Sequence, residues 1–285
     1  MRAGSHWFRR LVVLYWTIAA GVLFLSPTVF GQPNPNSPTT QWVPIVYGPA
    51  NFPDVSGDQQ NGTVEVDLVG NRNEPSFYMQ YVSGYLGFRL RLGGDANPAG
   101  FKSVALVGLD VGLTGALDVF IGVNNQGNRS QISIWSAGPG ANTSPGTTSV
   151  GNQLFSYTET SIDYSFAAVN STIDPSAVNF DLNADGRPDR FLSFFVPFAD
   201  IVSALSTQNI TFTTNSPIDL VALTSTSLNN LNGDINGANG GIGSAQPWAQ
   251  LGALSPPVIP APEPSEILIS CLAGTAALCF FRRRK

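Results

Sequence analysis

The sequence predicts an all-β fold, an antiparallel β-sandwich or jelly roll, on three observations. The chain has 285 residues, 43% of them hydrophobic and only 12% charged, against about 25% charged in an average soluble domain. It contains 29 Gly and 21 Pro, which favour turns over long helices. Between these turn residues, apolar and polar side chains alternate in short runs with the two-residue period of a strand. About ten such runs in succession are typical of a two-sheet domain.

The strands are expected from about residue 60 onward. In the run 86–92, leucine and phenylalanine alternate with glycine and arginine, so we expect Arg89 and Arg91 to face solvent. Only residues 198–205 have helical character, and that segment is brief. The other predicted strands are 63–69, 104–111, 117–123, 131–135, 153–157, 191–198, 210–214 and 220–224.

The composition divides the chain into five parts. We expect a signal peptide (1–31), an extended leader (32–60), the β-sandwich body (61–250), a Pro-rich spacer (251–261) and a C-terminal segment (262–285). The first part has three arginines before the apolar run 11–25, and small residues precede an expected cut at Gln32. That run is shorter than the about 20 residues of a membrane span, which favours cleavage over the alternative of an uncleaved anchor.

The C-terminal segment has the pattern of a membrane anchor. Residues 267–281 are uncharged and are predicted to form a transmembrane helix. Four basic residues follow at once and would remain on the cytoplasmic side, which leaves the body outside. These membrane-stop residues are Arg282, Arg283, Arg284 and Lys285.

A short motif precedes this helix. The three parts in order (the motif, the apolar helix and the basic end) resemble the PEP-CTERM sorting signal of Gram-negative bacteria. The motif residues are Pro262, Glu263, Pro264 and Ser265. The resemblance implies export, a transient stay in the inner membrane, processing by an exosortase (a membrane cysteine protease-transpeptidase), and delivery to the cell surface or the exopolysaccharide matrix. It covers about the last 24 residues and says nothing about the body. A plain tail anchor is the alternative.

Charge and residue types exclude several functions for the body. Residues 32–261 hold seven basic residues against seventeen acidic ones, so no basic face is available for nucleic acid. The single histidine, His6, and both cysteines, Cys271 and Cys279, lie in the terminal segments. The body therefore has no Ser-His-Asp or Cys-His mechanism and no zinc site built from His or Cys.

One loop has the spacing of a calcium site. Oxygen-bearing side chains stand at its positions 1, 3, 5 and 9, with Gly186 at position 6 for the bend and a backbone carbonyl at position 7. The predicted ligands are Asp181, Asn183, Asp185, Arg187 (through its carbonyl) and Asp189. The loop resembles those of dockerins and of FG-GAP and thrombospondin type 3 repeats, but it has Leu192 where an EF-hand has glutamate. We expect structural Ca²⁺ here; a metal-free turn is the alternative.

Two further segments share this composition. Residues 110–118 keep Asp at positions 1 and 9 and Gly at position 6, but Gly112 and Thr114 replace two ligands, so we expect no metal there. They are a degenerate copy of the loop or a coincidence of turn composition. The Asn- and Gly-rich residues 228–243 form a second oxygen-rich loop, more typical of a mobile surface segment than of a metal site.

Three functions remain for the body. The first is a non-enzymatic protein of the cell surface or exopolysaccharide matrix. The second is a calcium-dependent carbohydrate-binding module, which needs exposed aromatic side chains such as Tyr78 and Tyr81. The third is a polysaccharide hydrolase or lyase that uses two carboxylates, with Glu65, Glu74 and Glu159 as candidates. The sequence favours the first.

Overall fold

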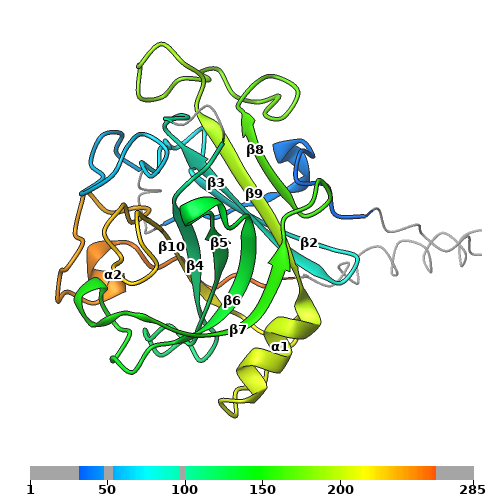
Figure 1. Ribbon diagram of the computed structural model, residues 1–285, viewed down its shortest axis with the longest axis vertical. Coiled ribbons are helices and arrows are strands. Elements are labelled where there is room, and N and C mark those ends of the chain that lie inside the picture. Colours follow the sequence, from blue (N-terminus) through cyan, green and yellow to red (C-terminus); the bar gives the residue numbers. More distant parts are fainter. Residues whose placement is uncertain (1–31, 48–53, 97–99, 261–285) are drawn as a thin grey trace, which may run out of the picture. The chain divides into compact units, whose positions relative to one another are not determined.

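Ten strands form two five-stranded antiparallel sheets in the computed structural model, which describes residues 32–47, 54–96 and 100–260. The all-β prediction is confirmed (Figure 1). The first sheet has the strands β1 (Val43–Pro44), β2 (Phe77–Val82), β3 (Tyr85–Leu92), β9 (Arg190–Pro197) and β8 (Tyr164–Ala168), in that order. The second has β10 (Asp219–Ser225), β4 (Val104–Asp110), β5 (Val119–Asn124), β6 (Gln131–Ala137) and β7 (Val150–Thr158).

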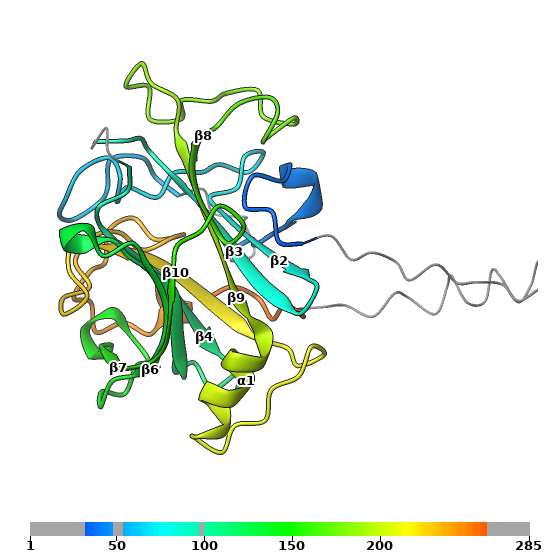
Figure 2. The same ribbon diagram turned by 45° about the vertical axis from the view of Figure 1, so that its right-hand side comes forward.

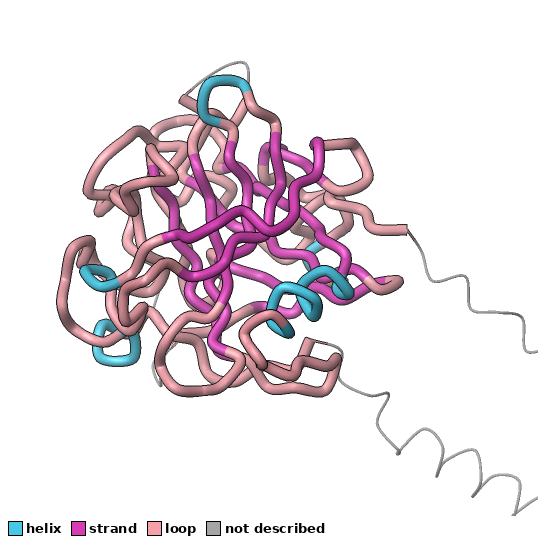
Figure 3. Tube along the Cα trace, turned by 60° about the horizontal axis from the view of Figure 1, so that its bottom comes forward, coloured by secondary structure: helices cyan, strands magenta, loops and turns pink. Residues whose placement is uncertain are grey.

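Helices are short and lie at the periphery of the strands (Figure 3). The helix α1 (Phe198–Ser206) confirms the predicted helical segment and follows β9 directly. The other helical turns are α2 (Trp248–Leu251), η1 (Thr39–Gln41), η2 (Gln126–Asn128) and η3 (Pro145–Thr147). No helix among the described residues is long and apolar enough to cross a membrane. The predicted signal peptide, sorting motif, membrane helix and basic end lie outside the described residues.

The main core lies where the two sheets meet (Figure 2). The predicted alternation in β3 holds for its apolar residues: Leu86, Phe88, Leu90 and Leu92 are all fully buried in this core. They pack with the alternate residues of β9 and with those of β4, β5 and β10 from the other sheet. The burial of both inner faces is the main stabilising contribution to the fold.

The outer faces are covered as well, which corrects one prediction. Arg89 and Arg91 were expected in solvent, but both are fully buried. The chain before β2 packs Trp42 onto this face of the first sheet, together with Ile173 and Phe195. The alternation of β3 predicts which residues share a face, but it carries no information about what covers that face.

The second sheet is covered by the chain that follows β10. Its outward residues, Phe120 and Trp135 among them, pack with Ile235, Trp248 and Ala253. The N–H and C=O groups of Ile218 and Val258 pair at 2.9 Å, so part of the predicted Pro-rich spacer extends the edge beside β10. A bridge is available there because Val258 retains an N–H that its proline neighbours lack.

Two predicted strands are not formed. Residues 64–66 make a turn, and Leu68 forms only an isolated bridge with Leu92. Residues 210–214 are irregular, although Phe212 is buried at the end of the core. In the first case the acidic residues of the run accept hydrogen bonds from other segments instead of facing solvent: Asp67 from the Gly57 N–H and Glu65 from the Ser103 hydroxyl. In the second, the turn at Thr213–Ser216 and the proline after it end the extended run.

Candidate metal centre

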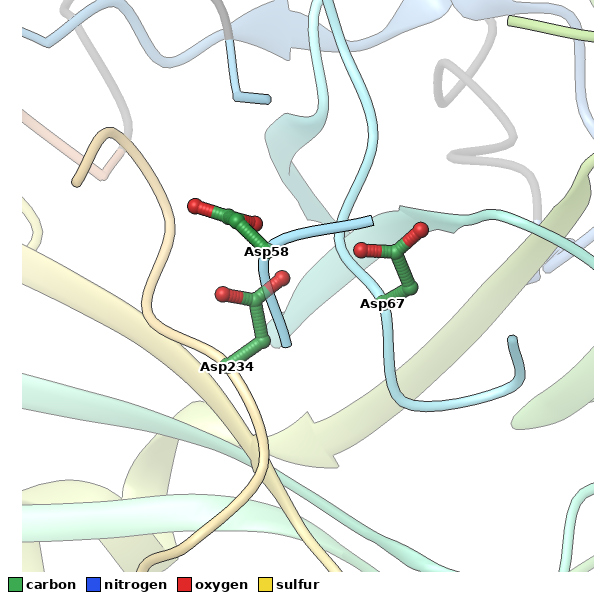
Figure 4. A group of neighbouring side chains, drawn as sticks. All are labelled: Asp58, Asp67 and Asp234. Carbon is green, nitrogen blue, oxygen red and sulfur yellow. The ribbon is translucent and has the colours of Figure 1, made fainter. Parts of the chain in front are cut away.

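Three aspartates from separate segments meet beside the edge of the body. Each of Asp58, Asp67 and Asp234 offers a carboxylate oxygen, and these oxygens all lie within 4.8 Å of one another. Figure 4 shows the three side chains arriving from three different stretches of backbone. Asp67 and Asp234 are fully buried and Asp58 is half-buried.

Backbone N–H groups hold these carboxylates in place. Asp234 accepts hydrogen bonds from Leu68 and Ile235, both at 2.7 Å. Asp67 accepts from Gly57 at 3.0 Å through both oxygens, and Asp58 accepts from Gly240 at 2.8 Å. Charge-assisted hydrogen bonds of this kind are strong and directional. They therefore hold the three carboxylates in fixed orientations relative to one another.

A fourth aspartate, Asp54, interacts electrostatically with this cluster. Asp54 is only 3% exposed, and its Oδ1 accepts a hydrogen bond from Gly237 at 2.8 Å. Its Oδ2 is buried and accepts no hydrogen bond from any described residue, and the same is true of Oδ1 of Asp58. A cavity of about 20 Å³, room for one water molecule, lies beside Asp54, Tyr47 and Ser76.

The electrostatics of the cluster are unfavourable without a cation. Burial and the neighbouring carboxylates raise the pKa of Asp67 to about 6 and that of Asp234 to about 8. The pKa of Asp54 is raised well above its ordinary range by burial first, and then by Asp234 as its strongest charged neighbour. The two ion pairs among the described residues use Asp189 and Asp95, so neither neutralises this cluster.

Gly93 and Gly94 lie between the aspartate cluster and the calcium loop predicted from the sequence. A Cβ added at Gly93 would lie 3.0 Å from Oδ2 of Asp67 and 2.9 Å from Nδ2 of Asn183. A Cβ added at Gly94 would lie 3.6 Å from Oδ2 of Asp185. The loop 181–189 therefore packs close to the aspartate cluster, and a side chain at Gly93 would push the two apart.

Within the loop, the predicted ligands are engaged in hydrogen bonds. Asp181 accepts from the backbone N–H groups of Asp185 and Gly186, at 3.1 and 2.9 Å. Asn183 and Asp185 likewise accept from N–H groups two residues further on. Asp189 forms a fully buried ion pair with Arg91, at 2.7 Å, and is thus already neutralised.

The degenerate segment 110–118 adopts the same turn. Asp110 accepts from the N–H groups at positions 5 and 6, Thr114 and Gly115, just as Asp181 does. In both loops the aspartate side chain at position 9 accepts a hydrogen bond from the backbone N–H at position 2. Positive φ values recur at position 4 (58° at Ala184, 52° at Leu113) and at position 6 (87° at Gly186, 81° at Gly115). This turn forms in 110–118 with Gly112 and Thr114 at positions 3 and 5, so its conformation does not depend on the Asn and Asp side chains that hold these positions in 181–189.

The candidate catalytic glutamates do not form an open pair of carboxylates. Glu65 is buried and accepts a hydrogen bond from Ser103 at 2.7 Å. Glu74 is buried too; hydrogen bonds from Asn71 and from backbone N–H groups of Asn179 and Val178 outweigh the effect of burial and lower its pKa. Glu159 is half-buried, and burial raises its pKa to about 7.

The aromatic side chains considered for sugar stacking serve the packing instead. Tyr78 is 4% exposed and makes an edge-to-face contact with Phe191. Tyr81 is half-buried against Phe198, and Tyr85 is half-buried as well. No aromatic side chain among residues 32–47, 54–96 and 100–260 is exposed. The described residues therefore present no aromatic platform.

A groove opens beside the strands of the second sheet. It has a volume of about 360 Å³ and lies between the segment 145–150 and the loop that follows β10. Its lining combines apolar side chains, such as Leu228 and Leu231, with the polar side chains of Thr148, Ser149 and Asn230.

The sequence did not point to the aspartate cluster as a unit. Asp234 lies in the oxygen-rich segment 228–243, where composition gave a weak signal, whereas Asp54, Asp58 and Asp67 had none. Asp67 stood in a run predicted as a strand, where an acidic residue is expected to face solvent. No family model matches this chain, and comparisons with the curated proteins and with the solved structures give no match either.

Proposed function

We propose that this chain is an exported, non-enzymatic protein of the cell surface or exopolysaccharide matrix, with a calcium-stabilised β-sandwich as its body. The sequence features at both ends support export, and the tail that resembles a PEP-CTERM signal supports processing by an exosortase. The observation that carries the non-enzymatic part is the use of the candidate catalytic and sugar-binding side chains in packing. Glu65, Glu74 and Tyr78 are all at most 5% exposed.

The chemistry of the body fits a structural role. A hydrolase needs two carboxylates that reach the substrate, and buried carboxylates that accept hydrogen bonds from their own chain cannot do so. Most of the outer face of each sheet is covered by other parts of the chain, while β7 at the edge of the second sheet stays partly exposed. A low charge content with a net excess of acids suits a protein embedded among polysaccharides and divalent cations.

Replacement of Pro262-Glu263-Pro264 by three alanines tests the sorting part of the proposal. In cells that have an exosortase, we expect the variant to accumulate at full length in the inner-membrane fraction, because the protease lacks its recognition motif. Fractionation and immunoblotting of wild type and variant measure this. Replacement of Pro256-Pro257 by alanines, in the preceding spacer, is the matched control and should leave delivery normal. Unchanged surface delivery of the tail variant would contradict the proposal.

The groove favours a carbohydrate-binding module as the second candidate. Its volume of about 360 Å³ and its polar lining suit one or two sugar residues, without the aromatic platform. On a glycan array, the full-length chain should then bind a defined polysaccharide, and Asn230→Ala should weaken binding at least tenfold while Tyr81→Phe leaves it unchanged. An array without signal would count against this candidate and leave the first unaffected.

A further inference from the structure

The aspartate cluster needs either a cation or bound protons to relieve its repulsion, because no ion pair of the described residues involves it. Asp58, Asp67 and Asp234 approach within 4.8 Å, and the ion pairs of the described residues lie elsewhere. Carboxylates this close repel one another strongly in a buried site. Their backbone partners are all N–H donors, which stabilise the ionised form rather than the protonated one.

A neighbouring buried carboxylate also has an oxygen without a partner among the described residues. Asp54 is only 3% exposed, and its Oδ2 has no hydrogen-bond partner among the described residues. Its other oxygen is held by Gly237, three residues beyond Asp234, and Asp234 is its strongest charged neighbour. A buried acceptor without a partner costs about 1 to 3 kcal/mol, and a charged one more, so this oxygen is expected to have an unseen partner.

The geometry suits one hard cation. Two oxygens that each lie about 2.4 Å from a calcium ion are at most about 4.8 Å apart, and the three carboxylate oxygens all lie within 4.8 Å of one another. Calcium accepts irregular sets of six to eight oxygen ligands, whereas Mg²⁺ demands a regular octahedron and keeps several waters. Zinc prefers the nitrogen and sulfur ligands of His and Cys, and the body contains neither residue.

We propose that Asp58, Asp67 and Asp234 bind one Ca²⁺ that fastens the two sheets to each other, with Asp54 as a further acidic side chain beside them. Asp67 precedes Leu68, which pairs with Leu92 of β3 in the first sheet. Asp234 precedes Ile235, which pairs with Leu223 of β10 in the second sheet. Residues 54–58 join both from the segment that leads into the first sheet. An ion at this point ties together stretches of chain that are up to 176 residues apart in the sequence.

This site deepens the calcium part of the proposed function, and it rests on that function in one respect: export brings the body into medium that contains calcium. It is separate from the ligand set predicted in the loop 181–189, although Gly93 and Gly94 bring the two close together. The loop satisfies its oxygens with its own N–H groups, whereas the cluster leaves buried oxygens without partners. The cluster is therefore the stronger candidate.

Thermal unfolding of the full-length chain in detergent tests the site. The melting temperature, Tm, is measured in excess chelator, in calcium and in magnesium, and calorimetric titration gives the number of ions bound. At a hundredfold excess of calcium over Kd, we expect Tm to rise by about 5 to 10 °C, with one ion bound per chain. Asp58→Asn and Asp234→Asn should each abolish the rise, because each removes a charged ligand. The matched control Asp185→Asn, in the neighbouring loop, should keep it.

Several outcomes would overturn the proposal. They are the absence of any calcium response in the wild type, a response that survives Asp58→Asn, and a response lost in Asp185→Asn. An equal response to magnesium would overturn the assignment to calcium. If the four carboxylates merely share protons, the asparagine variants should be more stable than wild type in chelator, with no effect of calcium. Asp58 is half-buried, so its variant decides the matter even if Asp234→Asn fails to fold. None of these results depends on surface delivery in cells, which tests the proposed function separately.

Discussion

Two arginines of β3 are buried beneath different segments, Arg89 beneath the chain before β2 and Arg91 beneath residues 179–189, and are stabilised in different ways. The Arg89 guanidinium lies 4.3 Å from the ring centre of Trp42 and 5.1 Å from that of Phe191. It donates hydrogen bonds to the carbonyls of Pro35 and Ser37, both at 2.8 Å, and burial lowers its pKa to about 9. Arg91 instead pairs with Asp189. Arg89 is therefore stabilised by backbone carbonyls and aromatic rings, whereas Arg91 is stabilised by the negative charge of a carboxylate.

The pair Arg91–Asp189 sets a residue-scale prediction. Asp189→Ala should lower the free energy of unfolding by about 3 to 5 kcal/mol, because it leaves a buried guanidinium without its counter-charge. Equilibrium unfolding in urea measures this loss. Arg187→Ala, an exposed neighbour in the same loop, should change stability by less than about 0.5 kcal/mol. A loss for Asp189→Ala as small as that of Arg187→Ala would contradict the structural role of the pair.

Glu159 sets a pH-dependent prediction. Burial raises its pKa from 4.5 to about 7, and its Oε1 has no hydrogen-bond partner among the described residues. The folded state therefore binds the proton more tightly than the unfolded state does. The contribution of this group is most favourable below pH 4.5 and is lost as the pH rises from 4.5 to about 7.

Glu159→Gln should remove this loss. Above pH 7 the variant should be more stable than wild type by about 1 kcal/mol, a value reduced because the side chain is half exposed to screening solvent. At pH 4 the two proteins should be equally stable, because wild-type Glu159 is then protonated in both states. Urea unfolding of both proteins across this pH range measures the difference. A difference that is independent of pH would contradict the assignment.

At the scale of elements, the pairing of β3 with β9 depends on a glycine. Gly87 lies opposite Phe195, and a Cβ added at Gly87 would approach the Phe195 ring to 2.2 Å. The ring is itself fixed against Trp42, with centroids 5.3 Å apart. Little room is available for adjustment in a strand with a partner on each side.

Gly87→Ala should therefore destabilise the protein by at least about 2 kcal/mol through overpacking. Thermal or urea unfolding measures the loss. Gly112→Ala is the control, because its added Cβ would meet only a methyl group of Thr114 at 3.2 Å. Phe195→Leu in the Gly87→Ala background should recover part of the loss by removing the ring. If Gly87→Ala is as mild as Gly112→Ala, the close approach is not important for stability.

At the scale of the whole body, the segment before β2 is part of the fold. Trp42, Ile45 and Tyr47 are buried, and Ile45 donates its backbone N–H to Phe77 at 2.9 Å. The Tyr47 hydroxyl accepts a hydrogen bond from the Ala222 N–H of β10, so the segment touches both sheets. It also supplies the carbonyls that hold Arg89.

Truncation tests this contribution. A chain that begins at Gln32 should unfold cooperatively on heating, whereas a chain that begins at Asp54 should not, because it exposes Arg89 and the apolar surface around it. Circular dichroism during heating, with a fluorescence probe of exposed apolar surface, measures both. Equal cooperative transitions in the two chains would show that the segment is dispensable.

The sequence by itself determined the all-β class and the positions of most strands. The alternation in residues 86–92 and the runs that became β4, β5, β6, β9 and β10 are local patterns, and strand formation responds to them locally. The prediction was wrong at 63–69, where the buried acidic side chains of Glu65 and Asp67 accept hydrogen bonds from other segments of the chain. It also omitted β8, whose five residues (Tyr164–Ala168) alternate weakly and depend on β9 for pairing.

Only the tertiary structure decided which side chains meet. Asp234 bonds the N–H of Leu68, 166 residues away, and no local period encodes that approach. Alternation likewise predicts that Arg89 and Arg91 share a face, but the covering segments turn that face into an interior. The calcium-like spacing of 181–189 recurs in 110–118 as the same hydrogen-bonded turn, which shows that spacing alone specifies a conformation. A cation site needs charges brought together without partners, and that depends on how the whole chain packs.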